Sequence, residues 1–215
     1  MEKCCKSELC KGFSFKQKYK PVQSIVGNKD APILIIGLNP KTPKDEDDHY
    51  IDGFSAKELE HYFDNVTEKH NYFGRFKKVS DKLFSSLGKK DGVAHTDIIK
   101  CYSKTFPPGN CKSKDIEIII DNCKGYLVKQ LEKHPPKIVI CNGIDVCRTI
   151  KTIIKPLSKP SDNATSYLGV LERKEITVIL SGFIGRIDNY AKARLGEEIM
   201  RIWEDTIKIN TKEGE

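Results

Sequence analysis

The chain has 215 residues, of which 38% are hydrophobic and 31% are charged, a composition that is typical of a soluble globular domain rather than of a disordered or membrane chain. No apolar run approaches the roughly 20 residues that a membrane span requires, and residues 1–15 lack the continuous apolar stretch of a secretory signal. We therefore expect one monomeric, cytoplasmic domain over residues 1–215, with no membrane partner. The net charge of +7 suits a polyanionic partner, and a lysine-rich solvated surface accounts for it equally well.

Short apolar runs alternate along the chain with stretches of helical period. The apolar runs are rich in β-branched residues and do not alternate strictly, which predicts parallel strands buried on both faces; they cover residues 32–37, 94–100, 137–143 and 175–182. The helical stretches cover residues 57–63, 73–87, 114–132, 144–154 and 189–209, with Ser113 as a candidate N-cap. This order predicts an α/β fold, a three-layer α/β/α sandwich around a central, mainly parallel four-stranded sheet.

In such a sheet a ligand binds beyond the carboxyl ends of the strands. Those ends fall at residues 38–43, 101–110, 142–145 and 181–188. Residues 155–164 are rich in Pro, Ser and Asp and predict a surface loop, and residues 211–215 predict a frayed tail.

Five of the eight cysteines could converge on one metal ion or cluster. Cys4, Cys5 and Cys10 precede the first predicted strand, Cys101 ends the second, and Cys123 lies in the helix that follows. If an N-terminal arm crosses the ends of these neighbouring strands, the thiolates can meet, and four thiolates suit zinc or a 4Fe-4S cluster. Reduced, inert cysteines are the alternative, because neither a C-x-x-C pair nor a standard zinc pattern is present.

Three other cysteines and one acidic segment are weaker candidates for a functional role. Cys141 and Cys147 fall in a predicted strand and helix, where we expect small buried hydrophobic side chains. Cys111, in a loop, is a spare candidate ligand. The acidic segment at residues 44–52 is a solvated charge run or a divalent cation site.

Six short segments follow one another along the chain in an order that is characteristic of one known family. They read GLNPKTP at residues 37–43, YFGRFKKVSDKLF at 72–84, HTDIIKC at 95–101, PPGNC at 107–111, NCKGYLVKQL at 122–131 and KIVICNG at 137–143. Over most of its length the chain therefore resembles the family 4 uracil-DNA glycosylases, the iron-sulfur-containing branch of the uracil-DNA glycosylase superfamily.

The resemblance implies a DNA glycosylase of base-excision repair, which hydrolyses the N-glycosidic bond of a deaminated or damaged base flipped out of single- or double-stranded DNA. It also implies a 4Fe-4S cluster, with zinc as the less favoured metal. The implied ligands are Cys10, Cys101, Cys123 and either Cys4 or Cys5.

The same resemblance implies roles for residues at the strand ends. Asn39 would align the attacking water, and Tyr72 or Phe73 would stack on the base, unless these aromatics pack in the core instead. The other implied contacts are Gly37 and Leu38 with the base, and Lys41, Arg75 and Arg186 with the DNA strand.

Two positions depart from the family pattern. Asp97 stands where the family has a base-reading Asn, and an ionised carboxylate only accepts hydrogen bonds. Uracil is therefore a doubtful substrate; Asp97 could instead accept from an exocyclic amine, be protonated, or be structural. The closing segment SGFIGRIDNY at residues 181–190 lacks the family's His, which leaves Ser181 or Arg186 to stabilise the leaving base.

Within this closing segment, Phe183 and Ile184 could wedge into the gap that a flipped base leaves, or pack against the sheet. Because of the departures, a catalytically inactive iron-sulfur protein that binds nucleic acid with the same fold is the alternative to an enzyme.

Overall fold

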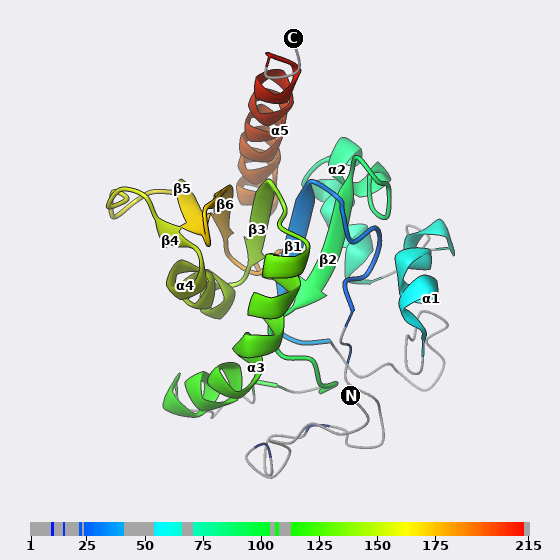
Figure 1. Ribbon diagram of the computed structural model, residues 1–215, viewed down its shortest axis with the longest axis vertical. Helices are drawn as coiled ribbons and strands as arrows, with labels where there is room; N and C mark the ends of the chain where they lie inside the picture. The colour runs from blue at the N-terminus through cyan, green and yellow to red at the C-terminus, as the bar shows by residue number, and fades with distance from the viewer. Residues whose placement is uncertain are drawn as a thin grey trace.

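A computed structural model describes residues 10, 15, 22, 24–40, 54–65, 71–103, 106–107 and 113–212. Its centre is a six-stranded sheet of order β2-β1-β3-β6-β5-β4 (Figure 1). Four strands are mutually parallel: β1 (Ile33–Gly37), β2 (Val93–Asp97), β3 (Ile138–Asn142) and β6 (Lys174–Ser181). These are the four predicted strands, so the parallel core of the α/β prediction is confirmed.

The sheet nevertheless has six strands rather than four. β5 (Ser166–Leu171) runs antiparallel to β6, and the two-residue β4 (Lys155–Pro156) runs antiparallel to β5. The predicted loop at residues 155–164 therefore begins with a short strand. The turn between β5 and β6 contains Glu172 and Arg173, both with positive φ, a conformation for which Asn and Gly are the usual signal. Because that signal is missing, the hairpin could not be recognised.

The helices follow the predicted order with different boundaries. They are α1 (Ala56–Glu60), η2 (Tyr62–Asn65), η3 (Phe73–Lys78), α2 (Asp81–Ser85), α3 (Ser113–Lys133), α4 (Ile144–Ile153) and α5 (Asn189–Lys212). The single helix predicted over residues 73–87 is a 3-10 helix followed by a short α-helix. Ser80 separates them: its backbone is extended, with φ −162° and ψ 129°, and its side chain accepts from the Leu83 amide as an N-cap.

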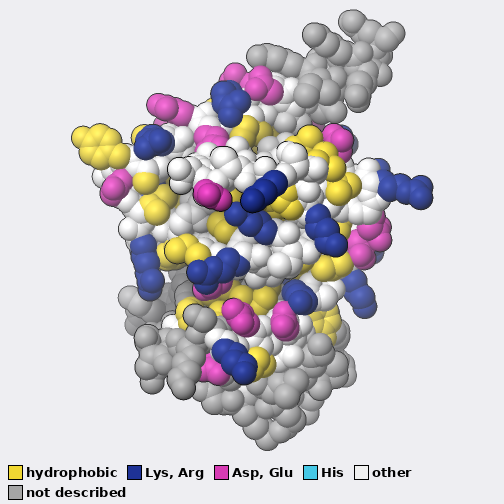
Figure 2. Space-filling view, turned by 90° about the vertical axis from the view of Figure 1, so that its left-hand side faces the viewer, with side chains coloured by type: hydrophobic (Ala, Val, Ile, Leu, Met, Phe, Trp, Pro, Cys, Tyr) yellow, Lys and Arg dark blue, Asp and Glu magenta, His cyan; other side chains and the backbone are white. Residues whose placement is uncertain are grey.

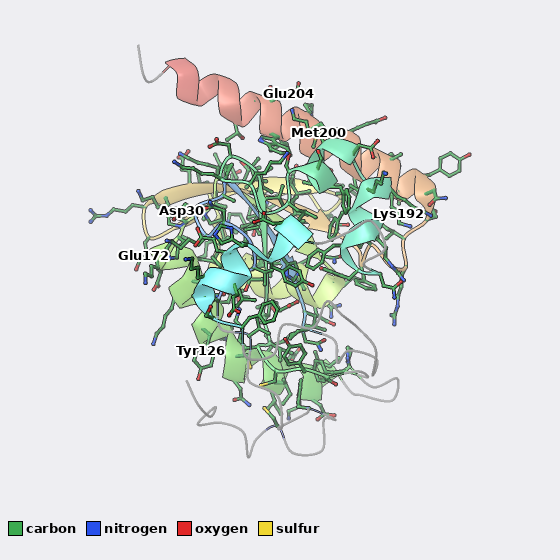
Figure 3. The ribbon with its side chains drawn as sticks, turned by 90° about the vertical axis from the view of Figure 1, so that its right-hand side faces the viewer. Asp30, Tyr126, Glu172, Lys192, Met200 and Glu204 are labelled. Carbon is green, nitrogen blue, oxygen red and sulfur yellow. The ribbon has the colours of Figure 1, made fainter. Side chains whose placement is uncertain are left out.

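Two hydrophobic cores lie on opposite faces of the sheet. Leu34 and Ile36 of β1 pack into a core with α3 and α4, whereas Ile33 and Ile35 pack into a core with η3, α2 and α5. Figure 3 shows this layering, with Met200 of α5 on one side of the sheet and Tyr126 of α3 on the other. All five residues of β1 are buried, as expected for a parallel strand covered on both faces. The three-layer sandwich is therefore confirmed.

The parallel strands all point their carboxyl ends toward one edge of the sheet. In Figure 1 the arrowhead of β2 points away from the C-terminal end of α5. No helix in the described ranges combines the length and the apolar character needed to cross a bilayer.

Two helical glycines provide a matched test of the packing of α5. A Cβ added to Gly196 would overlap the carbonyl oxygen of Val79, whereas a Cβ on Gly125 of α3 meets nothing within 4 Å. We expect Gly196→Ala to lower the free energy of unfolding by about 1–3 kcal/mol through overpacking. Gly125→Ala should raise it by up to about 1 kcal/mol, because Ala is the better helix former. Urea denaturation of both variants measures the two signs; equal stabilisation by both would contradict the close packing of α5.

Candidate functional site at the carboxyl ends of the strands

The last residues of the four parallel strands lie side by side and form a row across the sheet. Gly37 pairs with Asp97, and Asn142 pairs with Ser181. β1 and β3 run in register through Ile36 and Cys141, so Gly37 comes opposite Asn142. From β2 to β6 the row reads Asp97, Gly37, Asn142 and Ser181. Strand alternation places it on the sheet face that carries η3 and α5.

Gly37 leaves room for the carboxylate of Asp97. A Cβ on Gly37 would overlap Asp97 Oδ1 and would lie 3.3 Å from Nε2 of His95. His95 is two residues before Asp97 on the same face of β2, and its Nε2 is 4.0 Å from Asp97 Oδ1. The absence of a side chain at residue 37 is therefore what allows an acidic group to lie against β1.

The hydroxyl of Tyr72 joins three structural elements. Nδ2 of Asn142 donates to it at 2.8 Å, and Nε2 of His95 lies 3.1 Å from it. Asn142 in turn accepts from the backbone amide of Ile184 at 2.9 Å through its Oδ1. The ring of Tyr72 meets Phe73, Phe76 and His95 edge to face. The aromatic segment that contains Tyr72, β2 and β3 are thus linked through one phenol, and Asn142 links them to the loop after β6.

Burial raises the pKa of the Tyr72 phenol far above its usual value of about 10. The negative charge of Asp97 raises it further, and the hydrogen bond from Asn142 acts in the opposite direction. The phenol is therefore neutral at physiological pH.

Asn39 lies in the loop after β1 and is buried. Its Nδ2 donates to the carbonyl oxygens of Pro40 at 2.9 Å and of Ser103 at 3.3 Å. The amides of Ile98 and Ile99 donate to Gly37 and Leu38, so the loops after β1 and β2 are bonded side by side. Both N–H groups of the Asn39 amide are used, which leaves its Oδ1 as the group that can hold a water.

Ser181 ends β6 next to Asn142. Its hydroxyl donates to the carbonyl of Gly182 at 2.8 Å, and its own carbonyl accepts from the Gly143 amide at 3.0 Å. Cys147 also donates to this carbonyl, at 3.4 Å. The single donor of the Ser181 side chain is therefore occupied within the protein.

The loop after β6 is held by the aromatic segment. Nη1 of Arg75 donates to the carbonyl of Gly185 at 3.2 Å, and Nε donates to Asn71. Arg186 is exposed at the turn of this loop. Of the two predicted wedge residues, Ile184 is buried in the core, with 1% of its surface exposed, whereas 38% of Phe183 is exposed. Phe183 is thus the one that faces solvent.

Two further predicted contacts lie in the cores. Phe73 is buried between Phe63 and His95, so Tyr72 is the aromatic nearer to the strand ends. Leu38 is partly buried against the core on the α3 side of the sheet.

The cysteines divide into two groups. Cys123 of α3 is in the core on the α3 side, Cys10 packs against the same core, and Cys101 is partly buried just after β2. Cys141 is fully buried and Cys147 partly buried, as predicted for small hydrophobic side chains. Among the residues that the structure describes, no three metal-ligating side chains come together. Cys4, Cys5, Cys111, Lys41 and the acidic segment 44–52 lie outside the described residues.

Lys100 is a buried cation between the strand end and α3. Its Nζ donates to Thr96 at 2.9 Å, to Gln130 at 2.7 Å and to the backbone carbonyl of Asp97. Burial lowers the pKa of Lys100 to about 8, and the charges of Asp97 and Cys123 act to raise it.

Other surface features lie elsewhere. A groove of about 760 Å³ runs along α3 and α4, beside the labelled Tyr126 in Figure 3, and contains no residue of the row. Figure 2 shows the side of the molecule where β4 and β5 lie, with Lys and Arg side chains spread among acidic ones. In contrast, several buried polar residues of the described part of the chain lie at or near the strand ends, among them Asn39, His95, Asn142 and Ser181.

Sequence reasoning missed His95 and Asn142. Both are buried polar residues of strands, and that is the only local signal they carry, because buried polar groups require partners. Their common partner Tyr72 is 23 residues from His95 and 70 residues from Asn142.

Comparison with known proteins agrees with this architecture. A sequence model of the uracil DNA glycosylase superfamily matches residues 25–182, which is more than half of the chain, and the chain therefore belongs to this superfamily. A type-4 uracil-DNA glycosylase from Archaeoglobus fulgidus is 27% identical over 119 residues, which cover 55% of this chain and 46% of that protein. The match thus spans about half the length of that relative.

Removal of the Tyr72 hydroxyl tests the network. We expect Tyr72→Phe to lower the free energy of unfolding by about 1–3 kcal/mol, because the buried Asn142 amide loses its acceptor. Above pH 10 an unfolded chain releases the Tyr72 proton while the folded chain retains it, so the stability of the parent protein falls as pH rises. Tyr72→Phe should reduce this fall.

The control is Tyr190→Phe, since 85% of Tyr190 is exposed and surface changes usually alter stability by less than about 0.5 kcal/mol. Denaturant unfolding at pH 7 and pH 10.5 measures both effects. Identical behaviour of the two variants would show that the Tyr72 hydroxyl contributes nothing.

Proposed function

We propose that the protein is a DNA glycosylase that hydrolyses the N-glycosidic bond of a deaminated or damaged base. The observation that carries this proposal is the row of strand-end residues with Asn39 beside it, in a chain of the uracil DNA glycosylase superfamily. The single sheet with a core on each face supports a single domain, and we propose that it acts as a monomer in the cytoplasm.

In the proposed reaction the bond between C1′ and the base breaks and a water adds to C1′. Oδ1 of Asn39 accepts a hydrogen bond from that water and so orients its lone pair toward the sugar. Tyr72 stacks on the flipped base, and Asp97 faces the base edge. Arg75 and Arg186, both exposed at this end of the molecule, bind phosphates of the DNA strand.

We further propose that the protein holds a 4Fe-4S cluster through Cys10, Cys101, Cys123 and one of Cys4 and Cys5, with zinc as the alternative metal. Support comes from the position of Cys101, four residues after the end of β2, and from the packing of Cys10 against the core that contains Cys123. Thiolates are the donors that such clusters require. Bound there, the cluster would serve as a structural cross-link between the start of the chain, β2 and α3.

The catalytic role of Asn39 is testable with lesion-bearing oligonucleotides. The substrates carry uracil, hypoxanthine or xanthine in single- and double-stranded form, and abasic sites are scored by strand cleavage. We expect Asn39→Ala to slow base release by about a hundredfold or more, because the water loses its orientation. The control Asn28→Ala alters an amide at the amino end of β1, where Oδ1 accepts from the Asp30 backbone, and should keep the parent rate.

If the parent protein binds these oligonucleotides in a salt-dependent manner but releases no base, and Asn39→Ala binds equally well, the protein is instead the catalytically inactive nucleic-acid-binding alternative. Circular dichroism of each variant confirms that the comparison is made between folded proteins.

The cluster is testable by colour and by metal analysis. Anaerobically purified protein should be brown and contain iron, and Cys101→Ser or Cys123→Ser should lose both, because a thiolate ligand is removed. The matched control is Cys147→Ser, which changes a partly buried cysteine of α4 and should stay brown. Colourless protein that contains zinc would identify the other metal, and full colour in both ligand variants would refute the ligand set.

A further inference from the structure

We infer that the site at the strand ends, beside Asp97, accepts a positively charged, ring-alkylated purine in preference to uracil. This inference rests on the proposed glycosylase function and refines its substrate class. It follows from the hydrogen-bond donors and acceptors at the strand ends: the described side chains of the row and of Asn39 use their donors within the protein and leave acceptors for a ligand.

Asn39 and Ser181 show how the donors are used. Both N–H groups of the Asn39 amide are bonded, to Pro40 and to Ser103, and the Ser181 hydroxyl is bonded to Gly182. An amide with its N–H groups engaged offers a ligand only its oxygen, and a hydroxyl has a single hydrogen to donate.

Asn142 does not replace the missing base-reading amide. Its Nδ2 donates to Tyr72 and its Oδ1 accepts from Ile184. Only 3% of its surface is exposed, so its amide is part of the scaffold. The two arginines at this end, Arg75 and Arg186, are exposed and are assigned above to the DNA strand.

Asp97 therefore sets the charge of the site. Its side chain is 11% exposed, and a carboxylate has about four lone-pair positions, so it can accept from a ligand in addition to its contacts in the protein. Among the described residues, the groups that face it include Nε2 of His95 at 4.0 Å and the neutral phenol of Tyr72. Lys100 is bonded to the backbone carbonyl of Asp97 and to Thr96 and Gln130, on the α3 side of the sheet.

This arrangement discriminates between leaving groups. Uracil departs as an anion, which a carboxylate nearby destabilises and which needs donors that the described row does not offer. A ring-alkylated purine is a cation while attached to the sugar. When its bond to C1′ breaks, the bonding electron pair moves to the purine, which departs as a neutral base.

Water then adds to C1′, and its extra proton passes to the solvent. The carboxylate of Asp97 attracts the cation and accepts from its amino or ring N–H groups, and the Tyr72 ring provides an aromatic face for a cation. The same residues thus favour binding of the cationic base, and its departure as a neutral molecule requires no hydrogen-bond donor at the leaving nitrogen.

The test compares release of 7-methylguanine and of uracil from otherwise identical duplex oligonucleotides under single-turnover conditions with the enzyme below saturation, so that the rate includes binding of the base; the free base is measured by chromatography. The parent protein should release 7-methylguanine at least about tenfold faster than uracil. Asp97→Asn keeps the side-chain shape, removes the charge and adds a donor; it should slow 7-methylguanine release by about tenfold to a hundredfold and accelerate uracil release. Asp91→Asn removes an exposed charge elsewhere and should change neither rate.

The outcomes separate the two proposals. Faster release of uracil than of 7-methylguanine by the parent, or an unchanged preference in Asp97→Asn, overturns the inference and leaves the glycosylase function standing. No release of either base, or of hypoxanthine, by a folded parent protein whose Asn39→Ala variant behaves identically overturns the proposed function, and the substrate inference with it.

Discussion

The parallel pairing of β1 with β2 on one side and with β3 on the other is the constraint on which the site depends. Because the three strands run in register, their last residues come side by side at one edge. Gly37 in the middle has no side chain, and the Asp97 carboxylate occupies the space that a Cβ would need. A different residue at position 37 would displace the carboxylate of Asp97. The position of the acidic group therefore depends on the absence of a side chain at residue 37.

Burial on both faces of the sheet has a second consequence. Polar side chains at the strand ends cannot rely on solvent and must be bonded within the protein. Asn142 satisfies this requirement with both ends of its amide, toward Tyr72 and toward the loop that follows β6. Arg75 makes a second link to the same loop at Gly185. The loop and the aromatic segment are therefore held together from two directions, a form of preorganisation that favours a precise ligand geometry.

The two places where the sequence is expected to depart from the family 4 pattern, residue 97 and the segment 181–190, both include residues at this edge. Asp97 offers a carboxylate, which only accepts hydrogen bonds when ionised, and the Ser181 hydroxyl is bonded to Gly182. Both features affect the charge at the strand ends and the hydrogen-bond donors and acceptors that are offered to a ligand. They leave the cores untouched, because the row lies beyond the last apolar residues of the strands.

The sequence by itself determined the four parallel strands, the order of the helices and the loop of Asn39, because hydrophobic period and short motifs are local properties of the chain. It also singled out Asp97 and Tyr72 as residues of the site. It could not determine β5, whose hairpin turn at Glu172 and Arg173 has no local signal, or the break of the helix at Ser80. The tertiary structure alone decided that His95 and Asn142 meet at the Tyr72 hydroxyl, because hydrogen bonds between residues far apart in sequence form only after the strands are aligned and their ends buried.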